Sequence, residues 1–229
     1  MLEERIEAGG VPARLYEPDG ASGLLLLGHG GAHSKDGARF VRLSRLHAER
    51  TGLAVVCIDA VDHGERSQPS VGGPIPKEWH SKNAEQMVGD WQTTVASLSS
   101  IGPAVAYVGF SMGVIFGIPT VAAMPTVRAA VFVAGGIPTG GGIDDEPLRP
   151  MLLRAASQLG RTSVLMLNKT ADVIFSAADS EELFNRFPGD LNRQRFSAGS
   201  HDDWTDEMID ESLQFLEAHA TAEPKTASD

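Results

Sequence analysis

Short aliphatic runs alternate with longer amphipathic segments through most of this chain, and this alternation restricts its fold more than any other feature. The runs have no alternating polar positions, which is typical of parallel strands buried on both faces; they lie at 23–30, 53–60, 104–110, 127–135, 162–168 and, more weakly, 192–198. Segments with apolar residues at helical spacing separate them, at 36–51, 82–100, 111–124, 179–187 and 202–220. Repeated strand–helix units predict an α/β fold with a doubly wound, mostly parallel sheet.

The N-terminal segment has a different pattern. Residues 5–18 form two short alternating halves around Gly9 and Gly10, which predicts an antiparallel hairpin that opens the sheet. The chain has 229 residues and no internal repeat or long linker, so we expect one α/β domain over 1–220 and a loose C-terminal tail over 221–229. In such a fold the functional side chains lie where strands end and helices begin.

Composition narrows the functional classes. Apolar residues make up 42% of the chain and charged residues 21%, which are ordinary values for a globular protein. The net charge of −11 argues against nucleic acid or an anionic membrane as the main partner, and the aliphatic runs are too short to cross a bilayer. The first ten residues contain no apolar signal segment, and the only cysteine is Cys57, so we expect a cytoplasmic location.

A candidate nucleophile lies directly after the run 104–110. Residues 109–113 read Gly-Phe-Ser-Met-Gly, which matches the G-x-S-x-G pattern, and the segment that follows has helical spacing. A strained turn between strand and helix presents the serine hydroxyl at the edge of the sheet, and small residues two positions away let the chain segments approach closely. We expect Ser111 to be a nucleophile; the alternative is a tight glycine turn whose serine only caps the helix.

A serine nucleophile needs a base, and the base needs a third group that fixes its tautomer. With this serine motif the order along the chain is serine, acid, histidine. Only His201 and His219 follow Ser111. His201 follows the run 192–198 and precedes the last helical segment, so it is the candidate base, whereas His219 is expected to be a solvated residue near the end of that helix.

Asp172 is the candidate acid, because it ends the short polar segment that directly follows the run 162–168. Asp202 and Asp203 adjoin the candidate base and are expected to open the last helix, where its dipole favours carboxylates. Asp144 and Asp145 lie in a glycine-rich loop, where no preceding strand positions them. Three separate strand ends therefore supply serine, acid and histidine in the order that the motif requires.

Acyl transfer also needs N–H donors for the negative oxygen of the tetrahedral intermediate. With this motif one donor is the backbone N–H of the residue after the nucleophile, here Met112. The other comes from the loop after an earlier strand, here the glycine-rich segment 28–33. We choose Gly31 as the second donor, with Ala32 next; the alternative is an ordinary glycine-rich turn.

With these residues placed, the chain resembles the α/β-hydrolase superfamily, and within it the small dienelactone-hydrolase-like serine esterases with little or no cap. The matching pieces span roughly residues 5–220 and lie at 26–31, 57–67, 109–113, 169–172 and 199–201. The resemblance implies that a carboxylic ester or related small acyl substrate is hydrolysed through an acyl-enzyme, without a metal or organic cofactor. Dienelactone hydrolases use a cysteine nucleophile, so the serine at position 111 argues against dienelactone itself. Thioesters, lactones and amides remain open as substrates, and the loop 65–81, with Trp79, is a candidate lid.

Two other functions remain open. The first third of the chain is rich in histidine, and His29, His33, Asp62 and His63 lie near the ends of strands expected to be neighbours, as the ligands of a metal-dependent hydrolase would. Against this, the H-x-H-x-D-H and H-E-x-x-H spacings are missing from the sequence. The other function is ligand binding without turnover; proteins of that kind usually lack part of the triad. His80 is expected in a loop, as a structural or solvated residue.

Overall fold

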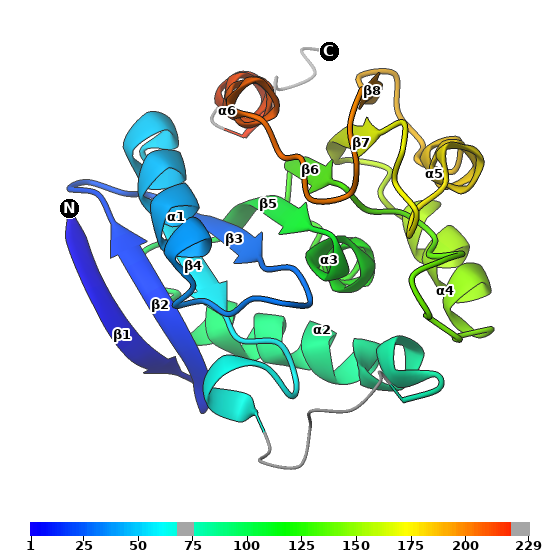
Figure 1. Cartoon of the computed structure of the whole chain (residues 1–229). Coiled ribbons are helices and arrows are strands. Elements are labelled where there is room, and N and C mark those ends of the chain that lie inside the picture. Colours follow the sequence, from blue (N-terminus) through cyan, green and yellow to red (C-terminus); the bar gives the residue numbers. More distant parts are fainter. Residues whose placement is uncertain (68–75, 221–229) are drawn as a thin grey trace.

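The computed structural model describes residues 1–67 and 76–220, and one mixed sheet runs through this part of the chain (Figure 1). Its strands are β1 (Leu2–Ala8), β2 (Val11–Glu17), β3 (Leu24–Gly28), β4 (Ala54–Ile58), β5 (Ala104–Phe110), β6 (Ala129–Val133), β7 (Ser163–Lys169) and β8 (Arg193–Ser197). They stand in the order β1-β2-β4-β3-β5-β6-β7-β8. The β1–β2 and β2–β4 pairs are antiparallel, and the pairs from β4–β3 to β7–β8 are parallel. The predicted fold class, including the opening hairpin, is confirmed.

Helices cover both faces of the sheet (Figure 1). They are α1 (Ala38–Thr51), α2 (Trp79–Ser97), α3 (Met112–Ala122), α4 (Leu148–Ala156), α5 (Ala177–Phe184) and α6 (Asp206–His219), with a single 3-10 turn, η1 (Gly64–Arg66), after β4. α1 and α6 pack on one face, and α2, α3, α4 and α5 pack on the other. Two apolar cores therefore enclose the sheet.

The aliphatic strands owe their composition to these two cores. In β3 the side chains of Leu25 and Leu27 belong to the core under α1 and α6, whereas Leu24 and Leu26 belong to the opposite core. All four side chains are fully buried. Because successive residues of a strand point to opposite faces, a central strand covered on both sides needs an apolar residue at every position. This is why the run carries no polar alternation.

Most helix ends lie within a few residues of the sequence prediction, and the starts of α2 and α6 differ from it most. α2 begins at Trp79 rather than at residue 82, so His80 lies in the first turn of a helix and not in a loop. α6 begins at Asp206 rather than at residue 202, because the Thr205 side chain accepts a hydrogen bond from the Met208 N–H and caps the helix there. The residues just before this cap, including Asp202 and Asp203, lie in a loop. The expected tail, 221–229, lies outside the described residues.

A buried histidine makes the stability of this fold depend on pH. His47 in α1 has no exposed surface, and its Nδ1 donates to the Leu43 carbonyl oxygen (2.7 Å), while its Nε2 has no partner. Burial lowers the pKa of His47 from 6.5 to about 4, although the hydrogen bond to Leu43 opposes this shift. Between these values the unfolded chain binds a proton that the folded chain does not, so acidification favours unfolding.

We therefore expect the free energy of unfolding to fall as the pH drops from about 6.5 to about 4. Urea unfolding followed across this range measures the slope. His47→Leu removes the titrating ring and should reduce the slope, even if the variant is less stable at every pH. An unchanged slope would contradict the assignment of this proton to His47.

Candidate active site

The turn between β5 and α3 holds Ser111 in a strained conformation. Its φ is 52° and its ψ −112°, in a region that costs a non-glycine residue about 1–3 kcal/mol. The Ser111 N–H donates to the Val133 carbonyl oxygen at the end of β6 (2.9 Å), and the Ser111 carbonyl accepts from the Val114 N–H (2.8 Å). The turn is therefore held from both sides, and the hydroxyl is directed away from the sheet toward the loops that follow β7 and β8.

The two glycines of the motif are required by close backbone contacts. A Cβ atom on Gly109 would lie 2.5 Å from the Gly113 carbonyl oxygen, and a Cβ on Gly113 would lie 2.6 Å from the Gly28 carbonyl carbon. The Tyr107 hydroxyl also donates to the Gly113 carbonyl oxygen (2.7 Å). Thus β3, β5 and the start of α3 touch through their main chains, as the spacing of the motif predicted.

One chain of hydrogen bonds joins Ser111, His201 and Asp172. The Ser111 Oγ lies 2.9 Å from His201 Nε2, and His201 Nδ1 lies 2.8 Å from Asp172 Oδ2. The serine follows β5, the aspartate follows β7 and the histidine follows β8. The structure therefore brings together the three side chains that the sequence selected, in the order nucleophile, base, acid.

The Asp172 carboxylate is held in its charged form. Its side chain is 1% exposed, and its Oδ1 accepts from the Ile174 and Phe175 N–H groups (2.8 and 3.0 Å). Burial alone would raise the pKa of Asp172, but the bond from His201 and these two backbone bonds outweigh it and hold the pKa below its ordinary value. An ionised acceptor at Oδ2 favours the His201 tautomer with its proton on Nδ1, which leaves Nε2 free to accept from Ser111.

The loop that carries His201 is fixed by its neighbours on both sides. The Asp203 carboxylate accepts from the N–H and the hydroxyl of Ser200 (2.6 and 2.8 Å). The Trp204 Nε1 donates to the His201 carbonyl oxygen (2.8 Å). Asp203, expected at the start of a helix, instead closes this loop. The Ala171 N–H, next to the acid, also donates to the Gly199 carbonyl oxygen (3.0 Å), so the two loops are tied together.

The expected oxyanion donors lie beside this chain of hydrogen bonds. Gly31 and Met112 line the same cavity as Ser111 and His201. Within the described residues, neither the Gly31 nor the Met112 N–H donates to another protein group. The Gly31 carbonyl oxygen lies 2.6 Å from His63 Nε2, which orients the Gly31–Ala32 peptide, the one that carries the Ala32 N–H. Both N–H groups are therefore available to an oxygen bound next to Ser111.

Two of the three histidines considered as metal ligands, His29 and His63, contact backbone groups instead. His29 is buried; its Nδ1 donates to the Gly30 carbonyl oxygen (2.8 Å) and its Nε2 accepts from the Ala60 N–H (3.0 Å). Burial lowers the pKa of His29 to about 4, so it is neutral in this role. His63 faces the carbonyl oxygens of Val61 and Gly31. Across 1–67 and 76–220, no three His, Cys, Asp or Glu side chains form a group that could hold a metal ion.

Two cavities meet at the candidate site. The first, of about 410 Å³, contains Ser111 and His201, and most of its other side chains are apolar, among them Met112, Ile115, Ile143, Ile174, Phe175 and Trp204. The second, of about 400 Å³, lies on the other side of Met112, toward Asp62, His63 and Trp79. Gly31, Ala32, His33, His80 and Met112 line both. A substrate bound at Ser111 in the first cavity can therefore extend past Met112 into the second.

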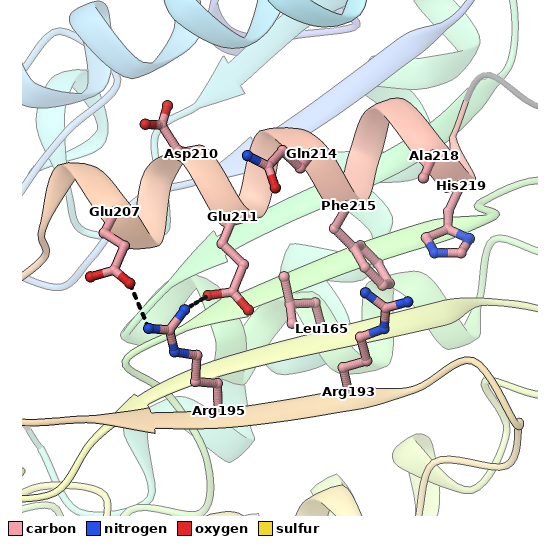
Figure 2. Close-up of a pocket in the computed structure, with 10 residues that line it drawn as sticks. All are labelled: Leu165, Arg193, Arg195, Glu207, Asp210, Glu211, Gln214, Phe215, Ala218 and His219. Atoms are coloured by element: carbon pink, nitrogen blue, oxygen red, sulfur yellow. Dashed lines mark hydrogen bonds and ion pairs between the residues drawn. The ribbon is translucent and has the colours of Figure 1, made fainter.

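A larger hollow of about 680 Å³ lies elsewhere, between α6 and the edge strand β8 (Figure 2). Three of its charged groups bind one another, since Arg195 pairs with Glu207 and Glu211 (2.6 and 2.7 Å). It shares no lining residue with the two cavities at Ser111. Since it holds no assembled nucleophile, the smaller cavities are the candidate active site.

The candidate lid is described only in part. Residues 68–75 of the loop 65–81 lie outside the described residues. Trp79 lines the second cavity, packs against the ring of Phe116 (5.8 Å between centroids) and donates from Nε1 to Asp62 Oδ2 (2.9 Å). It is thus a fixed wall of that cavity.

His80 and Asp145 are cavity features that the sequence reasoning missed. His80 is 3% exposed and lines both cavities, and the Asp145 side chain is 1% exposed beside it. The two residues are distant in sequence and meet because the loop before α4 returns to the start of α2, where the Glu78 N–H donates to the Asp144 carbonyl oxygen (2.9 Å). No pattern in the sequence signals this contact.

In the described ranges, no helix is long and apolar enough to span a membrane.

Comparison with known proteins agrees with this fold. The model of the family described as alpha/beta hydrolase family matches residues 24–222. The structure is similar to a cold-adapted esterase from an Arctic intertidal metagenomic library, with 25% identity, a TM-score of 0.79, and coverage of 95% of this chain and 93% of that chain. It is also similar to a dienelactone hydrolase from Anabaena variabilis (20% identity, TM-score 0.72, 96% and 98% covered) and to a monoacylglycerol lipase from Paleococcus ferrophilus (17% identity, TM-score 0.68, 95% and 99% covered). At these lower identities the likeness concerns the fold alone. The curated proteins yielded no match.

The close main-chain packing around Ser111 predicts that the protein becomes less stable when a side chain is added at Gly113. Gly113→Ala would push a Cβ into the Gly28 main chain, so we expect a loss of about 1–3 kcal/mol in the free energy of unfolding. Gly89→Ala in α2 is the matched control, because a Cβ there meets nothing within 4 Å; a helical glycine-to-alanine change should leave stability equal or higher by roughly 0.5–1 kcal/mol. Urea unfolding of both variants measures the difference, and equal stabilities would contradict the close packing.

Proposed function

The chain belongs to the alpha/beta hydrolase family, and from that premise we propose that it is a serine hydrolase that cleaves a carboxylic ester, or a related small acyl substrate, through an acyl-enzyme. The observation that carries the proposal is the continuous set of hydrogen bonds from Ser111 through His201 to Asp172, with the serine on a strained turn at the wall of a cavity. That arrangement supplies a nucleophile, a base and an orienting acid at one point.

The first half of the proposed reaction transfers the acyl group to the enzyme. His201 Nε2 takes the Ser111 proton as Oγ bonds to the carbonyl carbon, and the carbonyl electron pair moves onto oxygen. The N–H groups of Gly31 and Met112 stabilise that negative oxygen. When the intermediate collapses, the bond from carbon to the leaving oxygen breaks, and the proton on Nε2 passes to the departing alcohol.

The second half releases the acid. A water molecule gives a proton to His201 Nε2 and attacks the acyl carbon, and the proton returns to Ser111 Oγ as the ester bond to the enzyme breaks. Throughout, Asp172 stabilises the imidazolium and keeps the Nδ1 proton in place. The chemistry uses side chains and backbone N–H groups only.

The choice of an ester is supported by the similar structures. The Arctic protein, with 25% identity over nearly the whole chain, is an esterase. Thioesters, lactones and amides present the same carbonyl carbon to the nucleophile, so a substrate panel has to include them. Two cavities of similar volume flank the site, which suits a small acyl group joined to a small leaving group.

The nucleophile is tested by labelling with a fluorophosphonate probe, which reacts with activated serines. We expect one adduct, mapped by mass spectrometry to Ser111 and lost in Ser111→Ala. Ser97→Ala, an exposed serine of α2, is the control and should label like the wild type. A folded wild-type protein that does not label would contradict the proposal and favour a binding protein without turnover.

The acid is tested by Asp172→Asn. An amide in place of the carboxylate removes the acceptor that fixes the His201 tautomer, so we expect kcat for a p-nitrophenyl ester to fall by about 10⁴-fold, the loss known for this change in serine proteases. Asp202→Asn is the control, since this exposed carboxylate lies in the same loop as His201. If Asp202→Asn caused the large loss and Asp172→Asn did not, the acid would be reassigned.

A further inference from the structure

His80 stands where the two cavities adjoin. It lies in the first turn of α2, is 3% exposed, and lines the cavity with Ser111 as well as the one with Trp79. Its ring packs against Trp79 (5.0 Å between centroids) and Phe116 (6.0 Å). Besides His80, the polar side chains that line the cavity with Ser111 are His33, Ser111, His201 and Asp202, and most of the others there are apolar. The second cavity adds Asp62, His63 and Ser67.

Two polar atoms of this pair, His80 Nδ1 and Asp145 Oδ1, have no hydrogen-bond partner among the described residues. His80 Nδ1 is buried and has no hydrogen-bond partner, and Asp145 Oδ2 lies 4.0 Å from it. Asp145 Oδ2 accepts from the Ser81 N–H (2.8 Å), whereas Asp145 Oδ1 is buried without a partner. Buried polar groups in this state are unusual and call for a reason.

The carboxylate determines which ring nitrogen of His80 carries the proton. Burial lowers the pKa of His80 to about 4, although Asp145 opposes the shift, so the ring is neutral near pH 7 and has a single N–H. A carboxylate 4.0 Å from Nδ1 favours the proton at that nitrogen. Nε2 then has a lone pair. It is not among the buried unpartnered atoms and makes no hydrogen bond to the described residues, so it is the ring nitrogen open to the cavities.

We propose that His80 Nε2 is the polar recognition point of the substrate cavities, and that it accepts a hydrogen bond from a hydroxyl or amide N–H of the substrate while Asp145 holds the proton on Nδ1. The inference rests on the proposed hydrolase function and adds a substrate class: small acyl compounds with a hydrogen-bond donor on the acyl or the alcohol part. His80 is a specificity-determining residue, and Asp145 is a positioning residue that acts through it.

Hydroxylated substrates are expected to be preferred over plain ones because substrate binding removes water from His80 Nε2. A purely apolar substrate covers Nε2 and removes its water without replacing the hydrogen bond, whereas a hydroxylated substrate replaces it. An ether oxygen at the same place can only accept, so it meets the lone pair of Nε2 unfavourably. We therefore expect kcat/KM for a hydroxylated substrate to exceed that of its plain or methoxy counterpart by about tenfold.

The experiment compares matched substrates. On the acyl side these are p-nitrophenyl butyrate and its 3-hydroxy and 3-methoxy derivatives; on the alcohol side they are ethyl, 2-hydroxyethyl and 2-methoxyethyl butyrate. In the wild type at least one hydroxylated ester should be preferred. His80→Leu should bring that ratio close to one, and His80→Gln, which places an amide oxygen near Nε2, should restore part of it. His219→Gln, at the end of α6, is the control and should leave the ratio unchanged.

Asp145→Asn separates recognition from a structural role. Its amide can keep an oxygen at the Oδ2 position for the Ser81 N–H, but it removes the negative charge that favours the proton on His80 Nδ1. The preference for the hydroxylated ester should then fall while kcat/KM for the plain ester stays close to that of the wild type, which a simple loss of packing would not produce. Nitrogen-15 NMR of the wild-type histidines tests the same point directly: Nδ1 of His80 should be protonated and Nε2 should not.

The possible failures are distinguishable. If Ser111 does not label and plain esters are not hydrolysed, the proposed function is wrong and the inference falls with it. If plain esters are hydrolysed but no hydroxylated ester is preferred, or the preference survives His80→Leu, only the inference is wrong. A wild-type His80 protonated on Nε2 would overturn it as well.

Discussion

Three main-chain segments meet around Ser111 with no space for a Cβ atom between them, and the candidate site depends on this contact. Gly28 ends β3, Gly109 lies near the end of β5, and Gly113 lies in the first turn of α3. The loop that carries Gly31 starts at Gly28, and the serine turn lies between the other two glycines. Their contact therefore sets the distance between Ser111 and the proposed N–H donor of that loop. The left-handed conformation of Ser111 costs roughly 1–3 kcal/mol, and the burial of the surrounding strands and the bonds to neighbouring main chain offset that cost.

A neutral histidine, His29, and one buried ion pair hold the loops that surround this contact. His29 joins the loop after β3 to the loop after β4, because it binds the Gly30 carbonyl and the Ala60 N–H. The same two loops are joined by Lys35, whose N–H and Nζ both bind the Asp59 carboxylate (2.8 and 3.0 Å), with 1% and 0% of these side chains exposed. Lys35 Nζ also pairs with Asp36 and Glu65, so it is loss of the lysine that would leave the fully buried Asp59 carboxylate without this cation. The histidine-rich first third of the chain therefore supports the site and does not gather as a metal centre in the described part of the chain.

The parts of this structure that follow local rules could be predicted from the sequence. Aliphatic runs without polar alternation identified the buried strands, and the serine motif at the end of β5 led to an acid after β7 and a histidine after β8. The local sequence patterns gave wrong helix boundaries where contacts between residues distant in sequence determine the structure. The last helix starts at Asp206, not at residue 202, because Asp203 is engaged with Ser200 and Thr205 supplies the cap. The sequence pattern predicts a loop at His80, since nothing near it in sequence shows that Asp145 returns to lie beside it.

The position of His201 relative to the sheet has a consequence for how the candidate site can come apart. Ser111 follows the central strand β5, but His201 follows β8, which pairs with β7 alone at the edge of the sheet. No residue of β8 is fully buried, and its Arg195 is bound to α6 through exposed ion pairs (Figure 2), which contribute little in water. Regions with few buried contacts open at a lower free energy than the core. Detachment of this edge would separate His201 from Ser111 while both cores remain intact, so the contact between these two side chains can be lost at a lower free energy than that of global unfolding.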